Sequence, residues 1–394
     1  MKILGGTIKI FQKVASSLEN IDDVILGSPE KKLIFGISNY SRLKVDTFKI
    51  ALEIKKRLSR KKSIRVIAGK DGLAPSGSRG DKLSSAQSYQ YKLARHGIEL
   101  GLFAGGIGKL IAVQDIDFWS KVDYGKPRSD ARSGMLPPKL ARAMVNIALG
   151  QANSKIQETP RLRSGQAITK QIPNLNIQNS KVSNLGFSAS NLPPLAVVDP
   201  FCGSGNILIE ALVLGLDVIG SDISEKAVED TKANLDWLLN ESGIMNYESR
   251  IGNHNSQFNI HNSILQADAT KFDFGQIDRD FVVVSEPFLG QPRKHKLTIE
   301  EEKQAVSEAA KLYLDFLHNL RVTGLRVRAL VLVFPLLELK NGKRLSIFDC
   351  CVDKIKKIGY ILSCLPLIYG RDYQIVKREI VLLKQNNLLK NQRT

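Results

Sequence analysis

The sequence has few of the residues that bind metal ions or form disulfides. Its 394 residues include five histidines and four cysteines, which are Cys202, Cys350, Cys351 and Cys364. None of these cysteines stands in a C-x-x-C or cysteine–histidine spacing that would suggest zinc. We therefore expect reduced thiols, no metal site and a cytoplasmic protein.

Long apolar runs are also missing. The longest one, residues 329–337, is far shorter than the roughly 20 residues that a helix needs to cross a bilayer. The N-terminus lacks a cationic region followed by a long apolar stretch, which is the pattern of a secretory signal. The sequence therefore predicts neither secretion nor membrane insertion.

Positive charge, in contrast, is abundant and unevenly placed. The formal net charge is +18, and residues 1–140 hold 26 Lys and Arg against 13 Asp and Glu, a net charge of +13. Lys and Arg that face phosphates release condensed counterions, which strengthens binding without any reading of sequence. This asymmetry favours a polyanionic partner for the N-terminal part, and the alternative is a solvated basic surface that serves solubility.

The chain is long enough for two cores, and its pattern divides it into four parts. Residues 1–120 alternate short β-rich runs with helical ones, which predicts a basic α+β domain. Residues 121–150 read as a connecting segment that ends in a helix opened by two prolines. Residues 151–193 are rich in Ser, Asn, Gln and Pro and predict a flexible insert or linker. Residues 194–394 alternate strand-like and helical runs, which is typical of an α/β fold with a parallel sheet covered on both faces.

The individual elements follow from the same patterns. In the N-terminal part we expect strands at residues 7–10, 33–38, 64–68, 99–103 and 109–113, the last two as a hairpin, and helices at 45–58, 84–95 and 139–149, with Ser84 as an N-cap. In the C-terminal part we expect strands at residues 195–198, 217–221, 264–266, 281–285, 329–334, 360–363 and 375–383, the last two antiparallel, and helices at 207–214, 225–239, 298–319 and 347–358.

The strongest chemical signal is the segment Val197-Val198-Asp199-Pro200-Phe201-Cys202-Gly203-Ser204-Gly205. An apolar strand that ends in an acid, followed by a Gly-x-Gly turn and a helix, can hold a cofactor close to the backbone at the carboxyl edge of a sheet. Asp222 ends the next expected strand, where a carboxylate can accept both ribose hydroxyls of a nucleoside. A dinucleotide cofactor such as NAD is disfavoured, because Leu208 stands where the third glycine of G-x-G-x-x-G would fall.

The motif Asp-Pro-Phe-Cys-Gly-Ser-Gly resembles the cofactor motif of the THUMP-domain tRNA guanine-N2-methyltransferases and related amino-methyltransferases. The segment Gly134-Met135-Leu136-Pro137-Pro138-Lys139-Leu140-Ala141 is similar to the part of that family that joins the RNA-binding half to the catalytic half. The resemblance is strong over residues 121–150 and 195–290. It implies a C-terminal Rossmann-like class I methyltransferase domain, an N-terminal THUMP-like RNA-binding domain, S-adenosylmethionine as cofactor and RNA, above all tRNA, as partner.

The same resemblance assigns roles to individual residues. It implies that Asp199, Phe201, Gly203 and Gly205 hold the methionine part of the cofactor and that Asp222 binds its ribose. Asp268 follows the third strand, where the family places an acid beside the adenine amino group. For Asp268, a loop or helix-cap role is the structural alternative.

The catalytic position carries a departure from the family. Amino-methyltransferases have Asp/Asn-Pro-Pro-aromatic after the fourth strand, whereas this chain has Glu286-Pro287-Phe288-Leu289. An exocyclic amine is a poor nucleophile, so a carboxylate must accept its protons and orient it toward the methyl group, while an aromatic face stacks the base. Glu286 and Phe288, with Pro287 between them, are therefore the candidate catalytic residues. The longer acid and the earlier aromatic indicate a shifted pocket, another target base or weakened catalysis, and a plain strand exit with a buried Phe is the structural alternative.

Three other functions stay open on the sequence alone. Methylation of ribosomal RNA and methylation of an adenine amine in nucleic acid need the same chemistry. A non-catalytic RNA-binding protein that keeps the cofactor fold as a scaffold is the alternative from another class, and the altered tetrad motivates it. The sequence says nothing of the oligomeric state.

Overall fold

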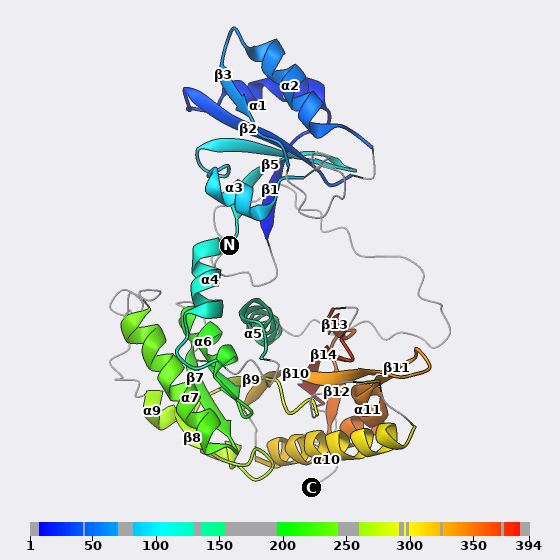
Figure 1. Ribbon diagram of the computed structural model, residues 1–394. Helices are drawn as coiled ribbons and strands as arrows, with labels where there is room; N and C mark the ends of the chain where they lie inside the picture. Colours follow the sequence, from blue (N-terminus) through cyan, green and yellow to red (C-terminus); the bar gives the residue numbers. More distant parts are fainter. Residues whose placement is uncertain are drawn as a thin grey trace. The chain divides into compact units, whose positions relative to one another are not determined.

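The computed structural model of the protein describes residues 8–41, 44–69, 82–129, 135–153, 195–242, 260–290, 295–296, 299–323, 326–371 and 374–386. The chain divides into two compact units (Figure 1). The N-terminal unit comprises residues 1–125 and 138–143, and the C-terminal unit comprises residues 126–137 and 144–394. None of the described helices combines the length and the apolar composition needed to span a bilayer.

The N-terminal unit contains a five-stranded mixed sheet with helices, which confirms the α+β prediction. In spatial order its strands are β1 (Lys9–Ala15), β5 (Gly106–Val113), β4 (Gly97–Phe103), β2 (Lys32–Asn39) and β3 (Ser63–Val66). Its helices are α1 (Asp22–Leu26), α2 (Thr47–Leu58), α3 (Ser85–Gln90) and α4 (Ile116–Tyr124). The amphipathic helix α2 buries Ala51, Ile54 and Leu58 in one cluster with Leu33 and Phe35 of β2, so one helix stripe and one sheet face make the core.

The local predictions in this unit are confirmed in part. β4 and β5 form the expected antiparallel hairpin, with Phe103 opposite Gly106. Ser84 caps α3 through a capping box, because its Oγ accepts from Gln87 N at 3.1 Å while Gln87 Oε1 accepts from Ser84 N at 3.0 Å. The helix ends at Gln90 rather than residue 95, since Lys92 adopts a positive φ of 49° that an α-helix cannot contain.

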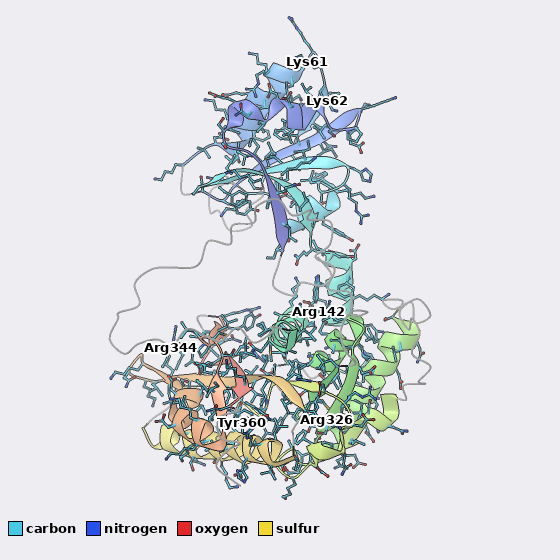
Figure 2. All side chains as sticks on the ribbon, turned by 180° about the vertical axis from the view of Figure 1, so that it is seen from behind. Lys61, Lys62, Arg142, Arg326, Arg344 and Tyr360 are labelled. Atoms are coloured by element: carbon cyan, nitrogen blue, oxygen red, sulfur yellow. The ribbon has the colours of Figure 1, made fainter. Side chains whose placement is uncertain are left out.

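Helix α4 was not predicted, because residues 117–135 look polar. Asp115 caps this helix by accepting a hydrogen bond from Phe118 N at 3.0 Å. Phe118, Trp119 and Val122 are buried. Arg142, labelled in Figure 2, lies over the Trp119 ring with its guanidinium carbon 5.3 Å from the ring centroid. The few apolar residues of this segment therefore suffice for a short packed helix.

The C-terminal unit contains a Rossmann-like sheet. Its strands lie in the order β8 (Ile264–Gln266), β7 (Asp217–Asp222), β6 (Ala196–Asp199), β9 (Phe281–Ser285), β10 (Val327–Glu338), β14 (Val376–Gln385) and β12 (Tyr360–Leu362). The first five are parallel, whereas β14 runs antiparallel to β10 and to β12. This arrangement confirms the predicted α/β class and the antiparallel pair at the end. The short strands β11 (Arg344–Ser346) and β13 (Leu367–Tyr369) were not predicted.

Helices follow the strands as a doubly wound fold requires. They are α6 (Asn206–Val213), α7 (Glu225–Asp236), α9 (Ile260–Ser263), α10 (Ile299–Thr323) and α11 (Ile347–Ile358). Helix α5 (Pro138–Asn153) precedes the first strand of this sheet and belongs to the C-terminal unit from residue 144 onward. Figure 1 shows α10 and α11 together along one side of this sheet. There Ala196 and Val198 of β6 share a buried cluster with Phe316 of α10 and Phe348 of α11, because alternate strand residues face the same side.

Helix α5 has a proline in its first turn, as expected, but it begins at Pro138 rather than residue 139 and continues past residue 149 to Asn153. Residues 151–153, which we had assigned to the insert, are therefore helical. Residues 154–193 of that predicted insert lie outside the described residues.

Candidate active site

Three of the predicted acids, Asp199, Asp222 and Glu286, gather where the strand order reverses, whereas Asp268 follows β8 at the end of the sheet. From β6 the chain moves outward to β7 and β8, and it then returns to β9 on the other side of β6. Crevices at the carboxyl ends of such strands are the ligand sites of open α/β sheets. Asp199, Asp222 and Ser285 are the last residues of β6, β7 and β9, so the topology places all three at this edge.

Two glycines shape the turn between β6 and α6. Gly203 has φ 54° and Gly205 has φ 82°, values that only glycine adopts without strain. Gly203 N donates to Asp222 Oδ2 at 3.0 Å, and Thr231 Oγ1 donates to Gly203 O at 2.8 Å. A Cβ on Gly203 would meet no atom within 4 Å, so the outer side of the turn is open space beside backbone. A ligand can approach the main chain there.

Asp199 is buried behind this turn and is only 2% exposed. Its Oδ1 accepts hydrogen bonds from Phe201 N at 3.2 Å and from Ser285 Oγ at 2.5 Å. Burial raises the pKa of Asp199 to about 7, and these two hydrogen bonds only partly oppose the rise. At neutral pH the carboxyl group is therefore about half ionised, and a nearby positive charge would favour its ionised form. Ser285 was not singled out from the sequence, where it is one small residue at the end of an apolar strand.

Asp222 holds the turn through hydrogen bonds and retains acceptor positions for a ligand. Its Oδ2 accepts from Gly203 N and its Oδ1 accepts from Ser224 N, each at 3.0 Å. A carboxylate has about four acceptor positions, so each oxygen retains one. The neighbouring Ile223 is 70% exposed and offers an apolar side chain beside the carboxylate. Sequence reasoning missed Ile223, although its position directly after the acid was visible.

Asp268 is engaged in its own turn. Its Oδ1 accepts from Thr270 N at 2.9 Å and from Thr270 Oγ1 at 2.7 Å, and Lys271 Nζ lies 3.2 Å from Oδ2. The hydrogen bond from the Thr270 side chain is the main reason that the pKa of Asp268 is lowered. This is the loop role that we weighed for Asp268 in the sequence, and Oδ2 still has an acceptor position next to Lys271.

The Glu286-Pro287-Phe288 segment leaves β9 at the same edge. Phe288 is 56% exposed, so it is not the buried Phe of an ordinary strand exit, and Pro287 is buried. Glu286 forms an ion pair with Arg378 of β14, whose Nε donates to Oε1 at 2.5 Å. Arg378 lies 92 residues further along the chain, and no local pattern announces this contact.

Residues 126–129 and 135–137 support the turn from outside. Lys126, which is 7% exposed, donates through Nζ to Asn206 Oδ1, and Asn206 Nδ2 donates to Leu136 O at 2.9 Å. Asn234 Nδ2 donates to Ser204 O and to Arg128 O, both at 2.8 Å. This stretch, predicted only as a connection, packs on the cofactor motif and helps to hold its shape.

The arrangement fits the donor that the resemblance implies. The open glycine turn and the buried Asp199, whose pKa is about 7, suit a cationic methionine group. Asp222, a second carboxylate with spare acceptor positions, suits a ribose. Among the described residues, no three His, Cys, Asp or Glu side chains gather closely enough to hold a metal ion.

Known proteins are similar to parts of this chain. Residues 188–288 match the family described as RMKL-like, methyltransferase domain. The tRNA (guanine(10)-N2)-dimethyltransferase of Methanothermobacter thermautotrophicus is 46% identical over 120 residues, which cover 29% of this chain and 24% of that protein. The enzyme of the same name from Methanocaldococcus jannaschii is 28% identical over 132 residues, covering 33% and 25%. The chain thus spans about a quarter of the length of these curated relatives.

A solved structure aligns over most of the chain. TrmN from Thermus thermophilus is 15% identical, with 96% of this chain and 83% of that chain covered and a TM-score of 0.43.

Proposed function

We propose that the protein transfers a methyl group from S-adenosylmethionine to an exocyclic amine of a nucleobase in RNA, with guanosine N2 in tRNA as the principal target, and that it works in the cytoplasm. The observation that carries the proposal is the turn at Gly203 and Gly205, set between two carboxylates at the switch point of a Rossmann-like sheet. The match to a methyltransferase domain family over this segment supports it, and so do the names of the curated relatives.

The chain's own residues would divide the work as follows. Asp199, Phe201 and the glycine turn would hold the methionine end of the donor, Asp222 its ribose, and Ile223 and Asp268 its adenine. When bound, S-adenosylmethionine supplies a sulfonium methyl group, and transfer breaks the carbon–sulfur bond, leaves its electron pair on sulfur and joins the carbon to the amine nitrogen.

Glu286 would accept hydrogen bonds from the amine and take up the proton that nitrogen loses as the new bond forms. The exposed ring of Phe288 would stack the base once it leaves the RNA helix. Both residues follow β9, the strand next to β6, so the acceptor and the methionine site share one edge of the sheet.

The N-terminal unit would bind the RNA as a THUMP-like domain. At the turn from α2 to β3 it has an open cavity of about 460 Å³ whose cations are Lys55, Arg60, Lys61 and Lys62. Figure 2 shows Lys61 and Lys62 side by side on this unit. A cluster of this kind suits RNA phosphates, which attract cations without regard to base sequence.

The decisive experiment is transfer of labelled methyl to bulk tRNA by the full-length protein, followed by mass spectrometry of the nucleosides. The proposal predicts labelled N2-methylguanosine or its dimethyl form. Label in ribosomal RNA or in methyladenosine would instead identify ribosomal RNA or an adenine amine as the target. Tight RNA binding with no transfer and no donor affinity would favour the non-catalytic RNA-binding alternative.

A further inference from the structure

The ion pair between Glu286 and Arg378 joins two segments that the sequence keeps far apart. Arg378 Nε donates to Glu286 Oε1 at 2.5 Å, and Arg378 Nη2 donates to Oε2 at 3.3 Å. The Glu286 side chain is 16% exposed and the Arg378 side chain is 11% exposed, so the pair is largely shielded from water. One guanidinium therefore engages both oxygens of the proposed amine acceptor in a two-pronged contact.

The neighbourhood explains why Glu286 needs this cation. Burial raises the pKa of Glu286, and the Arg378 guanidinium opposes the rise. Of the described titratable groups, two others interact electrostatically with Glu286 and add no positive charge: the carboxyl of Asp199 on β6 and the phenol of Tyr313 on α10, which donates to Val333 O at 2.7 Å. Within the part of the chain that the structure describes, Arg378 is the one cation in ion-pair contact with Glu286.

The strand that carries Arg378 sets its direction. On β14, Lys377 pairs with Glu338 at 3.1 Å, and Glu379 accepts from Ser346 Oγ at 2.6 Å. Successive strand residues point to opposite faces, so Lys377 and Glu379 share one face and Arg378 alone is directed to the other. β14 runs antiparallel to the parallel strands, so this first part of the strand lies at the edge where β9 ends.

We propose that Arg378 is a positioning residue, which keeps Glu286 ionised in its buried place and aims its remaining lone pairs at the substrate amine. This inference rests on the proposed function. Two of about four acceptor positions on the carboxylate are taken by Arg378, which leaves two for the amine protons. The arginine also accounts for the departure from the family tetrad, because the extra methylene of glutamate extends the carboxylate toward β14.

The test compares R378Q, R378K and the control R344Q. R344Q removes another Arg–Glu pair of the same sheet, in which Arg344 Nε donates to Glu338 Oε1 at 2.9 Å with Arg344 half exposed. Figure 2 labels Arg344 on this unit. Single-turnover methyl transfer to tRNA is followed from pH 5.5 to 8.5. We expect the acidic limb of the R378Q profile to move up by about one pH unit or more, R378K to recover most of this shift, and R344Q to follow the wild type.

A second readout separates this inference from the proposed function. The pKa of Glu286 is read in the donor-free protein by carboxyl-carbon NMR, with E286Q identifying the signal. We expect a clearly higher pKa in R378Q than in the wild type. Equal values in the two proteins overturn the inference whether or not methyl transfer occurs. Absence of transfer by the wild type, with the expected difference in pKa, would instead reject the proposed function and leave the ion pair as described.

Discussion

Single side chains at the carboxyl edge of the C-terminal sheet differ in how their charge is controlled. Asp199 is held by two hydrogen bonds and has a pKa of about 7, whereas Glu286 faces a full positive charge from Arg378. A hydrogen bond lowers the pKa of a buried acid less than a guanidinium does. Under the proposed function, the two acids would have different tasks: Asp199 would ionise beside the cationic donor, and Glu286 would accept the amine protons.

Replacing Glu286 by Gln should slow single-turnover methyl transfer by about 100-fold or more, because an amide cannot take the amine proton. Donor affinity, measured by calorimetry, should stay within about twofold, since the proposed donor contacts lie at the ends of β6, β7 and β8 and in the turns that follow them. E286D keeps an acid but shortens its reach toward Arg378, so an intermediate rate is expected. Transfer by E286Q at the wild-type rate would show that another group accepts the proton.

The buried Asp199 should make the stability of the C-terminal unit depend on pH. Its folded pKa of about 7 lies above its ordinary value of 3.8, so between these pH values the folded state keeps a proton that the unfolded chain has released. Stability therefore falls as pH rises through this window. In urea unfolding, the wild type should lose about 1–2 kcal/mol more than D199N between pH 5.5 and 7.5. Parallel behaviour of the two proteins would refute this account.

At the scale of elements, the turn from β6 to α6 depends on backbone conformation more than on side-chain contacts. Gly205 has φ 82°, and a Cβ on it would lie 3.1 Å from Thr231 Cγ2. The turn also ties β6 to α7, because Thr231 donates to Gly203 O and Asn234 to Ser204 O. A change in the turn would therefore be felt by both helices that follow it.

Gly205→Ala should destabilise the C-terminal unit by about 1–3 kcal/mol through strain and crowding. It should also weaken donor binding. Gly150→Ala is the matched control: Gly150 lies within helix α5, a Cβ there meets nothing within 4 Å, and alanine should stabilise the helix by up to about 1 kcal/mol. Urea unfolding and calorimetry measure both effects. If the two variants behaved alike, the positive φ would not be the constraint that we describe.

At the scale of the whole molecule, charge and chemistry are divided between two units. The Rossmann-like sheet of the C-terminal unit carries the candidate site acids, while residues 1–140 carry most of the excess positive charge. Lys62 donates to Ser28 O and Arg57 pairs with Asp22, so part of the basic run at the end of α2 is used within the fold. The exposed Lys55, Arg60 and Lys61 remain as the best candidates for RNA contact.

The triple variant K55Q/R60Q/K61Q should weaken tRNA binding and flatten its salt dependence. Each lost phosphate contact lowers the slope of log K against log salt by about 0.7–0.9, so three contacts account for about 2–3. The variant K354Q/K356Q/K357Q removes the same charge from α11, on the C-terminal unit, and should leave the slope nearly unchanged. Fluorescence anisotropy across a salt series provides the measurement. Equal slopes for the two variants would mean that only net charge matters.

Much of this protein could be predicted from local pattern. Apolar runs that alternate with helical segments predicted every parallel strand of the C-terminal sheet. The acid and two glycines at residues 199–205 predicted the turn, because backbone conformation depends on neighbouring residues. The capping box at Ser84 and the hairpin at Gly106 are equally local.

Contacts between distant segments could not be predicted in this way. The pairing of Arg378 with Glu286, the hydrogen bond from Ser285 to Asp199 and the packing of Lys126 against Asn206 join residues 80 or more positions apart. Sheet order and register bring these groups together, and burial then sets their charge. Residue types and their spacing therefore indicated which chemistry to expect. The assembled sheet decided that the pKa of Asp199 is raised to about 7 and that Glu286 is paired with Arg378, since desolvation and Coulomb interactions depend on distance in space.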